Sequence, residues 1–226
     1  MAKEVTSVTA QPRPALTSER IVRAAAGLIE REGVDALSMR RVAAELDVAV
    51  MSLYNHVPNK AALLQGVAEY VISGMDLADD PALPWGDRAR ALVRAFRKVA
   101  HDHPRCMTVV FTRKTEFPVG VRPAERALAL AEDAGFDGLT SVRIMRALMA
   151  YALGAQMREL GLVKTLGNLP AEPTAAYDWL DPEQFPHVTR LGPELARNDP
   201  EADFEFGLDL LIGALEALRR DRERTG

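Results

Sequence analysis

The chain has 226 residues, of which 48% are hydrophobic and 27% charged, a balance typical of one or two folded domains and unlike a disordered chain or a coiled coil. No stretch approaches the ~18 consecutive apolar residues of a membrane span. Residues 1–16, with Pro12 and Pro14, lack the apolar core of a signal peptide, so we expect a cytoplasmic protein. The single Cys106 excludes an internal disulfide framework and a thiolate zinc site, and we expect it to be a small buried hydrophobe rather than a redox sensor.

The first predicted helix follows this N-terminal segment, which we expect to be a flexible arm. Its apolar side chains share one face, and Glu32-Gly33 ends it as a C-terminal glycine stop. The apolar residues are Ile21, Ala25, Leu28 and Ile29.

Residues 38–57 predict two short helices around a tight turn. The first has Ser38 as its N-cap, and Asp47-Val48 interrupts its apolar period. The second ends where Pro58 forbids continuation. The inward positions are Met39, Val42, Ala43 and Leu46 in the first helix and Val50, Leu53 and Val57 in the second. This is the pattern of a helix-turn-helix, whose second helix enters the major groove of DNA.

The outer side of the second helix is the expected reading surface. Val50 and Met51 either touch thymine methyl groups or pack back on the protein. Asn55 either bridges to adenine or is merely solvated, and His56 either donates to DNA or packs. The full set is Val50, Met51, Ser52, Tyr54, Asn55 and His56.

Ser38 and Arg40 are further candidate DNA contacts, from the start of the first helix. Arginine is the best bidentate partner for guanine. The alternative for Arg40 is a surface arginine paired with an acidic neighbour.

Positive charge is local in this half of the chain. Residues 1–75 contain eight Lys and Arg against eight Asp and Glu. Such a neutral balance argues against a sequence-independent DNA coat and favours a few placed contacts. The local cations are Arg13, Arg20, Arg40, Arg41 and Lys60.

A further helix begins at Lys60 and carries apolar residues at Leu63, Leu64, Val67, Tyr70 and Val71. With it, the block resembles the TetR (tetracycline-repressor-like) family of transcriptional regulators. The resemblance rests on Leu37-Ser38-Met39-Arg40, Ala43, Val48 and the run Leu53-Tyr54-Asn55-His56-Val57-Pro58-Asn59-Lys60. One departure is Asp47, where the family commonly has glycine; aspartate tolerates the left-handed conformation better than most residues.

The resemblance implies roles for three polar residues. It places Tyr54 and the Ser52 hydroxyl at DNA phosphates, against the alternatives of a core tyrosine and an exposed serine. Lys60 is mildly unfavourable at a helix start, which is easier to explain if it faces phosphate. The implied domains are a DNA-binding domain at 17–75 and a ligand-binding and dimerisation domain at 76–226.

The second part of the chain predicts more helices, so we expect an all-α fold. After a turn-rich connector at 79–84, one helix runs from Asp87 to His103, with Ala91, Leu92, Ala95, Phe96 and Val99 on one side, and Pro104 breaks it. A short piece at 106–111 follows. The later helices are expected at 123–133, with Gly135 as the stop, at 138–160 and at 203–222; the proline-rich stretch 161–200 shows no long period.

Two of these helices, near 139–160 and 203–220, are apolar on more than one face, which favours a dimer interface. In the resembled family the corresponding pair forms a four-helix bundle with its two-fold mate. A two-fold homodimer requires an inverted-repeat operator on double-stranded DNA.

The resemblance also implies a small-molecule effector that releases the DNA. Aromatic and methionine side chains suit an apolar or aromatic effector, and the alternative for each is plain hydrophobic core. The candidates are Phe96, Met107, Phe111, Met145, Met149, Tyr151 and Trp179. A magnesium chelate at His101 and His103 is less favoured, because residues two apart on a helix face different directions.

We expect no catalytic residues, no metal site and no cofactor, because the sequence lacks a Gly-rich phosphate loop, a nucleophile elbow and zinc-ligand spacing. The alternatives are a helical small-molecule-binding or adaptor protein without sequence-specific DNA binding, and an uncharacterised enzyme. The adaptor does not explain Tyr54 and Lys60 together.

Overall fold

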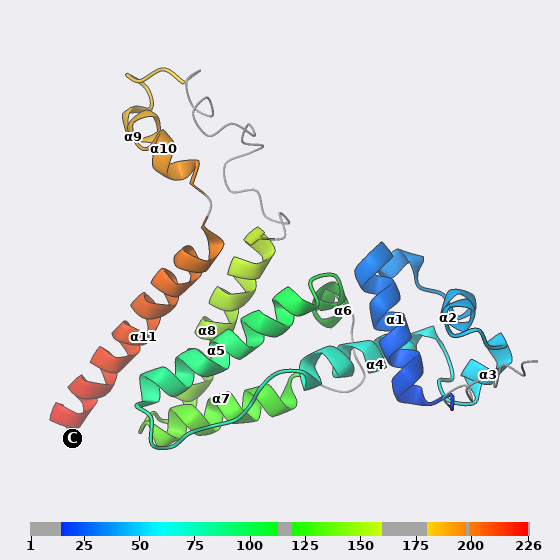
Figure 1. Ribbon diagram of the computed structural model, residues 1–226. Coiled ribbons are helices and arrows are strands. Elements are labelled where there is room, and N and C mark those ends of the chain that lie inside the picture. Colours follow the sequence, from blue (N-terminus) through cyan, green and yellow to red (C-terminus); the bar gives the residue numbers. More distant parts are fainter. Residues whose placement is uncertain (1–14, 113–118, 160–179, 198, 226) are drawn as a thin grey trace, which may run out of the picture. The chain divides into compact units, whose positions relative to one another are not determined.

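The structure is a computed structural model that describes residues 15–112, 119–159, 180–197 and 199–225. Within these ranges all regular secondary structure is helical, as the sequence predicts (Figure 1). The chain forms two compact units. One combines the residues up to Tyr70 with Arg105–Phe117, and the other combines Val71–Pro104 with Pro118–Gly226.

The first unit contains the predicted helix-turn-helix. Its helices are α1 (Ser18–Glu32), the short 3-10 helix η1 (Val34–Ala36), α2 (Met39–Leu46), α3 (Val50–Tyr54), most of α4 (Lys60–Ser73) and α6 (Cys106–Thr112). The predicted apolar stripes form its core, because Ile21, Val42, Leu53 and Val67 are completely buried. Gly33 ends α1 with a positive φ of 87°, as the glycine stop predicts.

Helix α6 packs against α1, although 73 residues of chain separate the end of α1 from the start of α6. The Glu30 carboxylate accepts hydrogen bonds from the backbone N–H groups of Arg105 and Cys106, at 3.2 and 2.8 Å. The Arg105 guanidinium donates to the carbonyl of Arg31 at 2.5 Å. The domain boundary expected at residue 75 did not predict that a later segment, Arg105–Phe117, belongs to the first unit.

Cys106 is completely buried in this unit, and its thiol lies 3.6 Å from the Ala26 carbonyl oxygen. Burial raises the pKa of the Cys106 thiol, and the neighbouring Glu30 raises it further. A thiol held neutral and away from solvent is a poor nucleophile. The expected role as a small buried hydrophobe is confirmed.

The turn between α2 and α3 depends on Asp47. It adopts the left-handed conformation, with φ 53° and ψ 51°, and its N–H donates to the carbonyls of Ala43 and Ala44 at the end of α2. Among the described residues, no other non-glycine has a positive φ. The prediction that aspartate can form this turn is confirmed.

We expect Asp47→Ala to lower the free energy of unfolding by about 1–2 kcal/mol, because alanine has no side-chain polar group that eases the left-handed conformation. Asp47→Gly removes the conformational penalty and is expected to leave stability unchanged or slightly increased. Urea unfolding of the two variants at one protein concentration measures both values. A more stable alanine variant than glycine variant would contradict this account of the turn.

The second unit contains a helical bundle formed by α5, α7, α8 and α11. The helices of this unit are α5 (Trp85–Asp102), α7 (Val121–Asp133), α8 (Gly138–Glu159), α9 (Pro186–Arg190), α10 (Gly192–Leu195) and α11 (Pro200–Thr225). Helix α8 contacts α5, α7 and α11, so it is central to the bundle (Figure 1). Both α9 and α10 are short and have a proline in the first turn. They lie in the stretch where the sequence shows no long period.

The predicted inward face of α5 is wrong in part. Ala91 is exposed and Ala95 is half-buried, whereas Ala89, Val93 and Arg97 are buried. The physical reason is that α5 packs against α7, α8 and α11 at once. A helix enclosed on several sides buries more than one stripe, and a single apolar period then misplaces the boundary.

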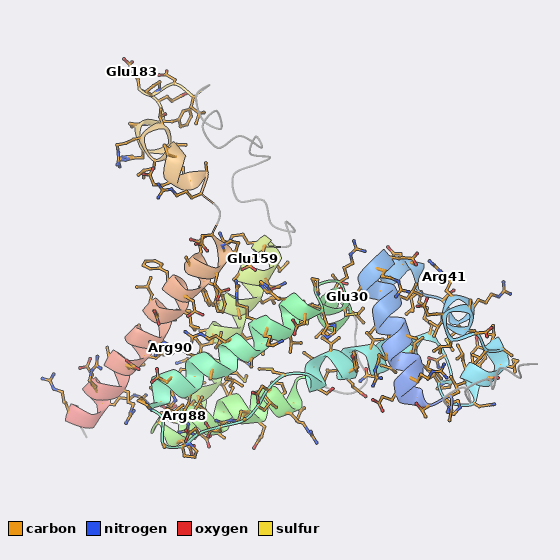
Figure 2. All side chains as sticks on the ribbon, viewed as in Figure 1. Glu30, Arg41, Arg88, Arg90, Glu159 and Glu183 are labelled. Carbon is orange, nitrogen blue, oxygen red and sulfur yellow. The ribbon has the colours of Figure 1, made fainter. Side chains whose placement is uncertain are left out.

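The connector before α5 is held by ion pairs. Arg88 of α5, labelled in Figure 2, donates to both carboxylate oxygens of Asp79 at 2.8 and 2.6 Å. Arg126 of α7 pairs with the same carboxylate. The hydrogen bonds from Arg88 hold the pKa of Asp79 below its usual range, ahead of smaller contributions from Arg126. Asp79 thus joins the connector to two helices of the second unit.

A charged cluster centred on the buried Arg97 joins α5, α8 and α11. The Arg97 guanidinium donates to Glu159 at 2.6 Å and to Glu201 at 3.0 Å, and it lies 4.2 Å above the centre of the Phe204 ring. Burial lowers the pKa of Arg97, but its hydrogen bonds to the two carboxylates outweigh burial and raise that pKa. Glu159 also contacts His101 Nε2 at 2.7 Å. Glu159 and Glu201 stand at the two ends of the segment that joins α8 to α11.

Candidate DNA interface and effector pocket

The helix-turn-helix is fixed from both sides. Ser38 Oγ accepts a hydrogen bond from the Arg41 N–H at 3.3 Å and so caps α2. Leu53 and Val57 are buried and hold α3 against the core. Ser18 Oγ donates to the His56 carbonyl at 3.3 Å, which ties the start of α1 to the residues after α3. The recognition helix therefore has a defined orientation within its unit.

The predicted reading surface is mainly solvent-exposed. Met51 is 72% exposed, and Tyr54, Asn55 and His56 are exposed as well. Val50 and Ser52 are half-buried. An exposed methionine at the front of a short helix is a large apolar group without a packing role in this unit. It is available to meet another surface.

Two cations of the first unit differ from their neighbours. Arg41 pairs with Glu32 at 2.6 Å, and Arg31 pairs with Glu45 at 2.8 Å. Arg40 and Lys60 are exposed, and no carboxylate in the described part of the chain pairs with either. Of the local cations predicted from the sequence, Arg41 is thus engaged within the protein. Ser38 is half-buried and engaged as the cap of α2.

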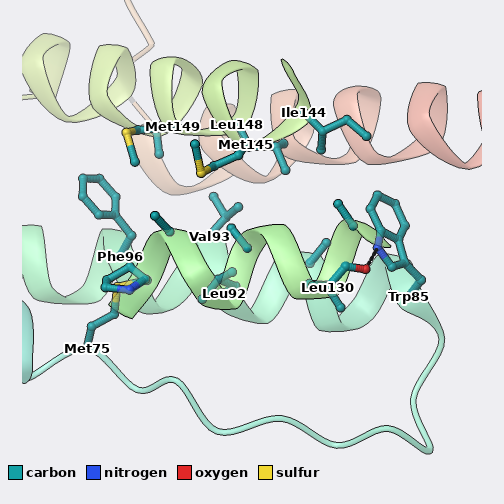
Figure 3. A pocket seen from close by; sticks show the side chains of 16 residues that line it. Met75, Trp85, Leu92, Val93, Phe96, Leu130, Ile144, Met145, Leu148 and Met149 are labelled. Carbon is teal, nitrogen blue, oxygen red and sulfur yellow. Dashed lines mark hydrogen bonds between the residues drawn. The ribbon is translucent and has the colours of Figure 1, made fainter. Parts of the chain in front are cut away.

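The second unit contains an apolar pocket between α5, α7 and α8 (Figure 3). Trp85 and Ile144 lie at one end, and Met75, Phe96 and Met149 lie at the other. The remaining lining residues are Ala89, Leu92, Val93, Pro123, Ala124, Ala127, Leu130, Ala131, Met145, Leu148 and Ala152. No lining residue is charged. Trp85 Nε1 donates to the Leu130 carbonyl at 2.9 Å, so the indole N–H is already satisfied.

The free volume of this pocket is about 80 Å³, less than the ~150 Å³ of an engineered apolar cavity that admits benzene. A larger ligand therefore has to displace lining side chains. Three methionines and Phe96 line the pocket, and methionine changes rotamer easily. The chemistry favours an apolar, aromatic guest over a charged one.

The predicted effector contacts fall into separate groups. Phe96, Met145 and Met149 line the pocket. Met107 is completely buried and Phe111 is exposed, both on α6 of the first unit. Three further lining residues, Trp85, Leu130 and Ile144, were not predicted from the sequence. They line the pocket from three different helices.

Two further predicted contacts lie elsewhere. The Tyr151 hydroxyl donates to the Phe204 carbonyl at 2.6 Å, and its ring stacks on Phe204 with centroids 5.5 Å apart. Tyr151 thus joins α8 to α11. Trp179 lies outside the described residues. Within those residues no group of three or more His, Cys, Asp and Glu side chains is arranged to hold a metal ion.

Helices α8 and α11 expose large apolar side chains although they also carry the core. Phe204, Leu208 and Ile212 of α11 point inward and are buried, whereas Phe206 is 67% exposed. The other exposed apolar residues on the two helices are Leu139, Met149, Leu210 and Leu218. This explains the two apolar faces seen in the sequence. Of the described helices, none has the length and apolar composition needed to cross a membrane.

Comparisons with known proteins agree with this architecture. Residues 21–67 match the family model described as bacterial regulatory proteins, tetR family, and residues 78–219 match the tetracyclin repressor-like C-terminal domain. The HTH-type transcriptional repressor DrrR1 of Streptomyces coeruleorubidus is 33% identical over 224 residues, covering 93% of this chain and 81% of that protein. The tetracycline repressor protein class G of Vibrio anguillarum is 28% identical and covers 88% of this chain and 93% of its own length.

Solved structures are similar over nearly the whole chain. Apo ActR from Streptomyces coelicolor has a TM-score of 0.77 at 26% identity and covers 94% of this chain and 100% of its own. The complex of the same TetR family protein with actinorhodin has a TM-score of 0.76, also at 26% identity, and covers 91% of this chain and 99% of that chain.

The exposed helix-turn-helix in one unit and the apolar pocket in the other define a DNA-binding regulator with a ligand-binding unit. The chain belongs to the tetR family of bacterial regulatory proteins. It is a ligand-responsive transcriptional repressor that binds operator DNA and acts as a dimer, and it is not an enzyme. The resemblance seen in the sequence is confirmed.

Proposed function

We propose that the homodimer represses transcription from an inverted-repeat operator and is released when an apolar or aromatic effector enters the pocket between α5, α7 and α8. The main support is the apolar lining of that pocket, in which the indole N–H of Trp85 already donates to the Leu130 carbonyl. The solved complex of ActR with actinorhodin supports a small-molecule effector for this chain. The regulator acts in the cytoplasm, where bacterial operator DNA lies.

The DNA contacts divide into two kinds in this proposal. Tyr54, Ser52 and Lys60 bind phosphates and position the protein, which carries no sequence information. Arg40 reads a base from the start of α2, and the exposed Met51 meets a thymine methyl group. Support comes from the exposure of Arg40, Met51, Tyr54 and Lys60, and from the missing carboxylate partners of Arg40 and Lys60 in the described structure. Val50, Asn55 and His56 complete the reading surface.

The dimer forms, in the same proposal, through the outer faces of α8 and α11. Exposed Leu139, Phe206, Leu210 and Leu218 provide the apolar surface that pairing would remove from water. A two-fold axis through this bundle makes the two recognition helices equivalent. The operator half-sites then stand about one helical turn of DNA, ~34–36 Å, or a multiple of it apart.

Release follows from linkage between the two ligands. An effector that favours the conformation unsuited to DNA by ~1–3 kcal/mol weakens operator binding by ~5- to 150-fold. Guest binding has to displace Phe96 and methionine side chains, because the free volume is about 80 Å³. Phe96 belongs to α5, and the chain runs from α5 through Pro104 into α6, which packs on α1.

A bulky side chain in the pocket should abolish the response to effector and spare DNA binding. We expect Ala127→Trp to fill the pocket from α7, while Ala129→Trp, on the exposed side of the same helix, serves as the matched control. The assay is a mobility shift on an inverted repeat selected from random DNA, with planar aromatic compounds of two to four rings as releasing agents. We expect release from wild type and Ala129→Trp, and at least a tenfold weaker response from Ala127→Trp.

Equal release of all three proteins would show that the effector binds elsewhere. Failure of wild type to select any inverted repeat would overturn the proposed operator. Circular dichroism of the two tryptophan variants reports whether each keeps its helical fold.

A further inference from the structure

A buried glutamine follows the apolar pocket-lining residues along α8 and is not itself one of them. Gln156 is on α8, one helical turn beyond the lining residue Ala152, and it is 4% exposed. Residues four apart share a helix face, so Gln156 continues the pocket-lining stripe of α8 by about 6 Å. On α5, Ala100 bears the same relation to the lining residue Phe96.

The orientation of the Gln156 amide is fixed by a backbone carbonyl. Its Nε2 donates to the Ala100 carbonyl oxygen at 3.3 Å. In a continuing helix this carbonyl would accept from the residue four positions later, but that residue is Pro104, which has no N–H. A carbonyl can only accept, so the NH₂ group has to face it and Oε1 has to face away.

Gln156 Oε1 is consequently left without a hydrogen-bond donor among the described residues, although it is buried. A buried acceptor without a partner is costly, and native proteins rarely keep one without a reason. A guest that brings a donor to this position would remove the cost, whereas an apolar guest would not.

We propose that Gln156 Oε1 is the polar anchor of the effector site. The effector is then a mainly apolar aromatic molecule with an uncharged donor, a hydroxyl or N–H, at one end. That donor lies toward the end of the pocket marked by Phe96 and Met149, and the apolar body extends toward Trp85 and Ile144 (Figure 3). The inference rests on the proposed effector pocket and specifies the polarity of its ligand.

The pocket also argues against a charged or metal-chelated ligand at this place. Its lining offers no counter-charge, and an unpaired charge is far more costly to bury than a hydroxyl. The nearest charged cluster on α8 and α5, Arg97 with Glu159, is already paired at 2.6 Å. A neutral donor is the group that matches a neutral amide oxygen.

The test uses two probes of nearly equal size, 2-naphthol and 2-methylnaphthalene, which differ in one donor. The chain has two tryptophans, and a Trp179→Phe background leaves Trp85, which lines the pocket, as the fluorescent reporter. Titration of the full-length dimer gives the Kd of each probe. We expect wild-type Gln156 to favour 2-naphthol, and Gln156→Met to reduce that preference by ~2- to 12-fold, the range of one hydrogen bond.

Two further variants separate recognition from packing. Gln156→Glu is measured at pH 5.5, because burial at this position favours the protonated carboxyl. That form has a hydroxyl for the Ala100 carbonyl and a free carbonyl oxygen, and it is expected to keep the preference. Ser141→Ala removes another buried polar group of α8, which bonds to the Phe136 carbonyl at 3.4 Å, and is expected to leave the preference unchanged.

The outcomes are distinct. An unchanged preference in Gln156→Met, or an equal loss of both probes, would overturn the anchor while leaving the pocket in place. Quenching of Trp85 by neither probe in wild type would overturn the proposed pocket and the anchor with it. If Gln156→Met does not fold, loss of the preference in Gln156→Glu would decide against the anchor.

Discussion

Replacing Arg97 with methionine is expected to lower the free energy of unfolding by about 3–5 kcal/mol, the cost of breaking a buried ion pair from one side. Arg97 is 7% exposed, and methionine can fill much of its volume. What methionine cannot do is neutralise Glu159, which is also nearly buried, lies 2.6 Å from the guanidinium and would keep only its contact with the more exposed His101 among the described partners. The loss therefore reflects a carboxylate deprived of its buried cation more than a lost contact.

The matched control is Arg94→Met on the same helix. Arg94 makes a comparable pair with Glu205, at 2.8 and 2.5 Å, but its side chain is 51% exposed. Because solvent screens such a pair, the expected loss is under about 1 kcal/mol. Urea unfolding at one fixed protein concentration measures both, since dimerisation makes apparent stability depend on concentration.

A double variant completes this prediction. Glu159→Gln removes the carboxylate charge, so Arg97→Met with Glu159→Gln is expected to be more stable than Arg97→Met alone. Equal losses for the Arg97 and Arg94 variants would show that burial of the cluster does not govern its contribution. The two ends of the segment between α8 and α11 would then be held mainly by apolar packing, including the Tyr151–Phe204 stack.

Lys60→Ala is expected to weaken operator binding for every DNA sequence and to reduce its dependence on salt. Each phosphate contact contributes ~0.9 to the slope of log K against log[salt], so a dimer that loses two contacts should lose about 2 from that slope. Arg41→Ala is the control. Arg41 is exposed, as Lys60 is, but it pairs with Glu32 at 2.6 Å. We expect Arg41→Ala to change the slope far less.

The other contacts should give different signatures. Tyr54→Ala is expected to weaken all sequences in the same way, whereas Arg40→Ala should relax the preference at one base by about 1–3 kcal/mol. Binding to a panel of single-base operator variants at two salt concentrations separates these effects. Uniform losses from Arg40→Ala would reduce Arg40 to a phosphate contact, and an unchanged slope in Lys60→Ala would remove Lys60 from the interface.

Local signals accounted for the first unit with few errors. Ser38 as a cap, Asp47 as a left-handed turn residue and Gly33 as a helix stop each act within a few residues of their own position. Such short-range interactions can be predicted from the sequence without knowledge of the tertiary contacts. The core of that unit also followed from single stripes, because each of its short helices buries one main face.

The pocket could be predicted only in part. Phe96, Met145 and Met149 were chosen for their chemistry, and that criterion equally selected Met107, which is core, and Tyr151, which bonds to Phe204. Chemistry alone does not tell which of several apolar residues face the same space. Trp85, at the first residue of α5, has no periodic neighbour before it that would place it in the pocket.

The sequence by itself determined the helical fold class, the helix-turn-helix, and the family, because these depend on capping, turn and periodicity signals within about one helix length. The tertiary structure alone decided that α6 packs on α1, that Arg97 is a buried charge, and that Gln156 Oε1 is buried without a hydrogen-bond donor among the described residues. Each of these arises where helices distant in the chain meet. Which residues are buried there depends on neighbouring helices on several sides, so the apolar period of one helix does not predict it.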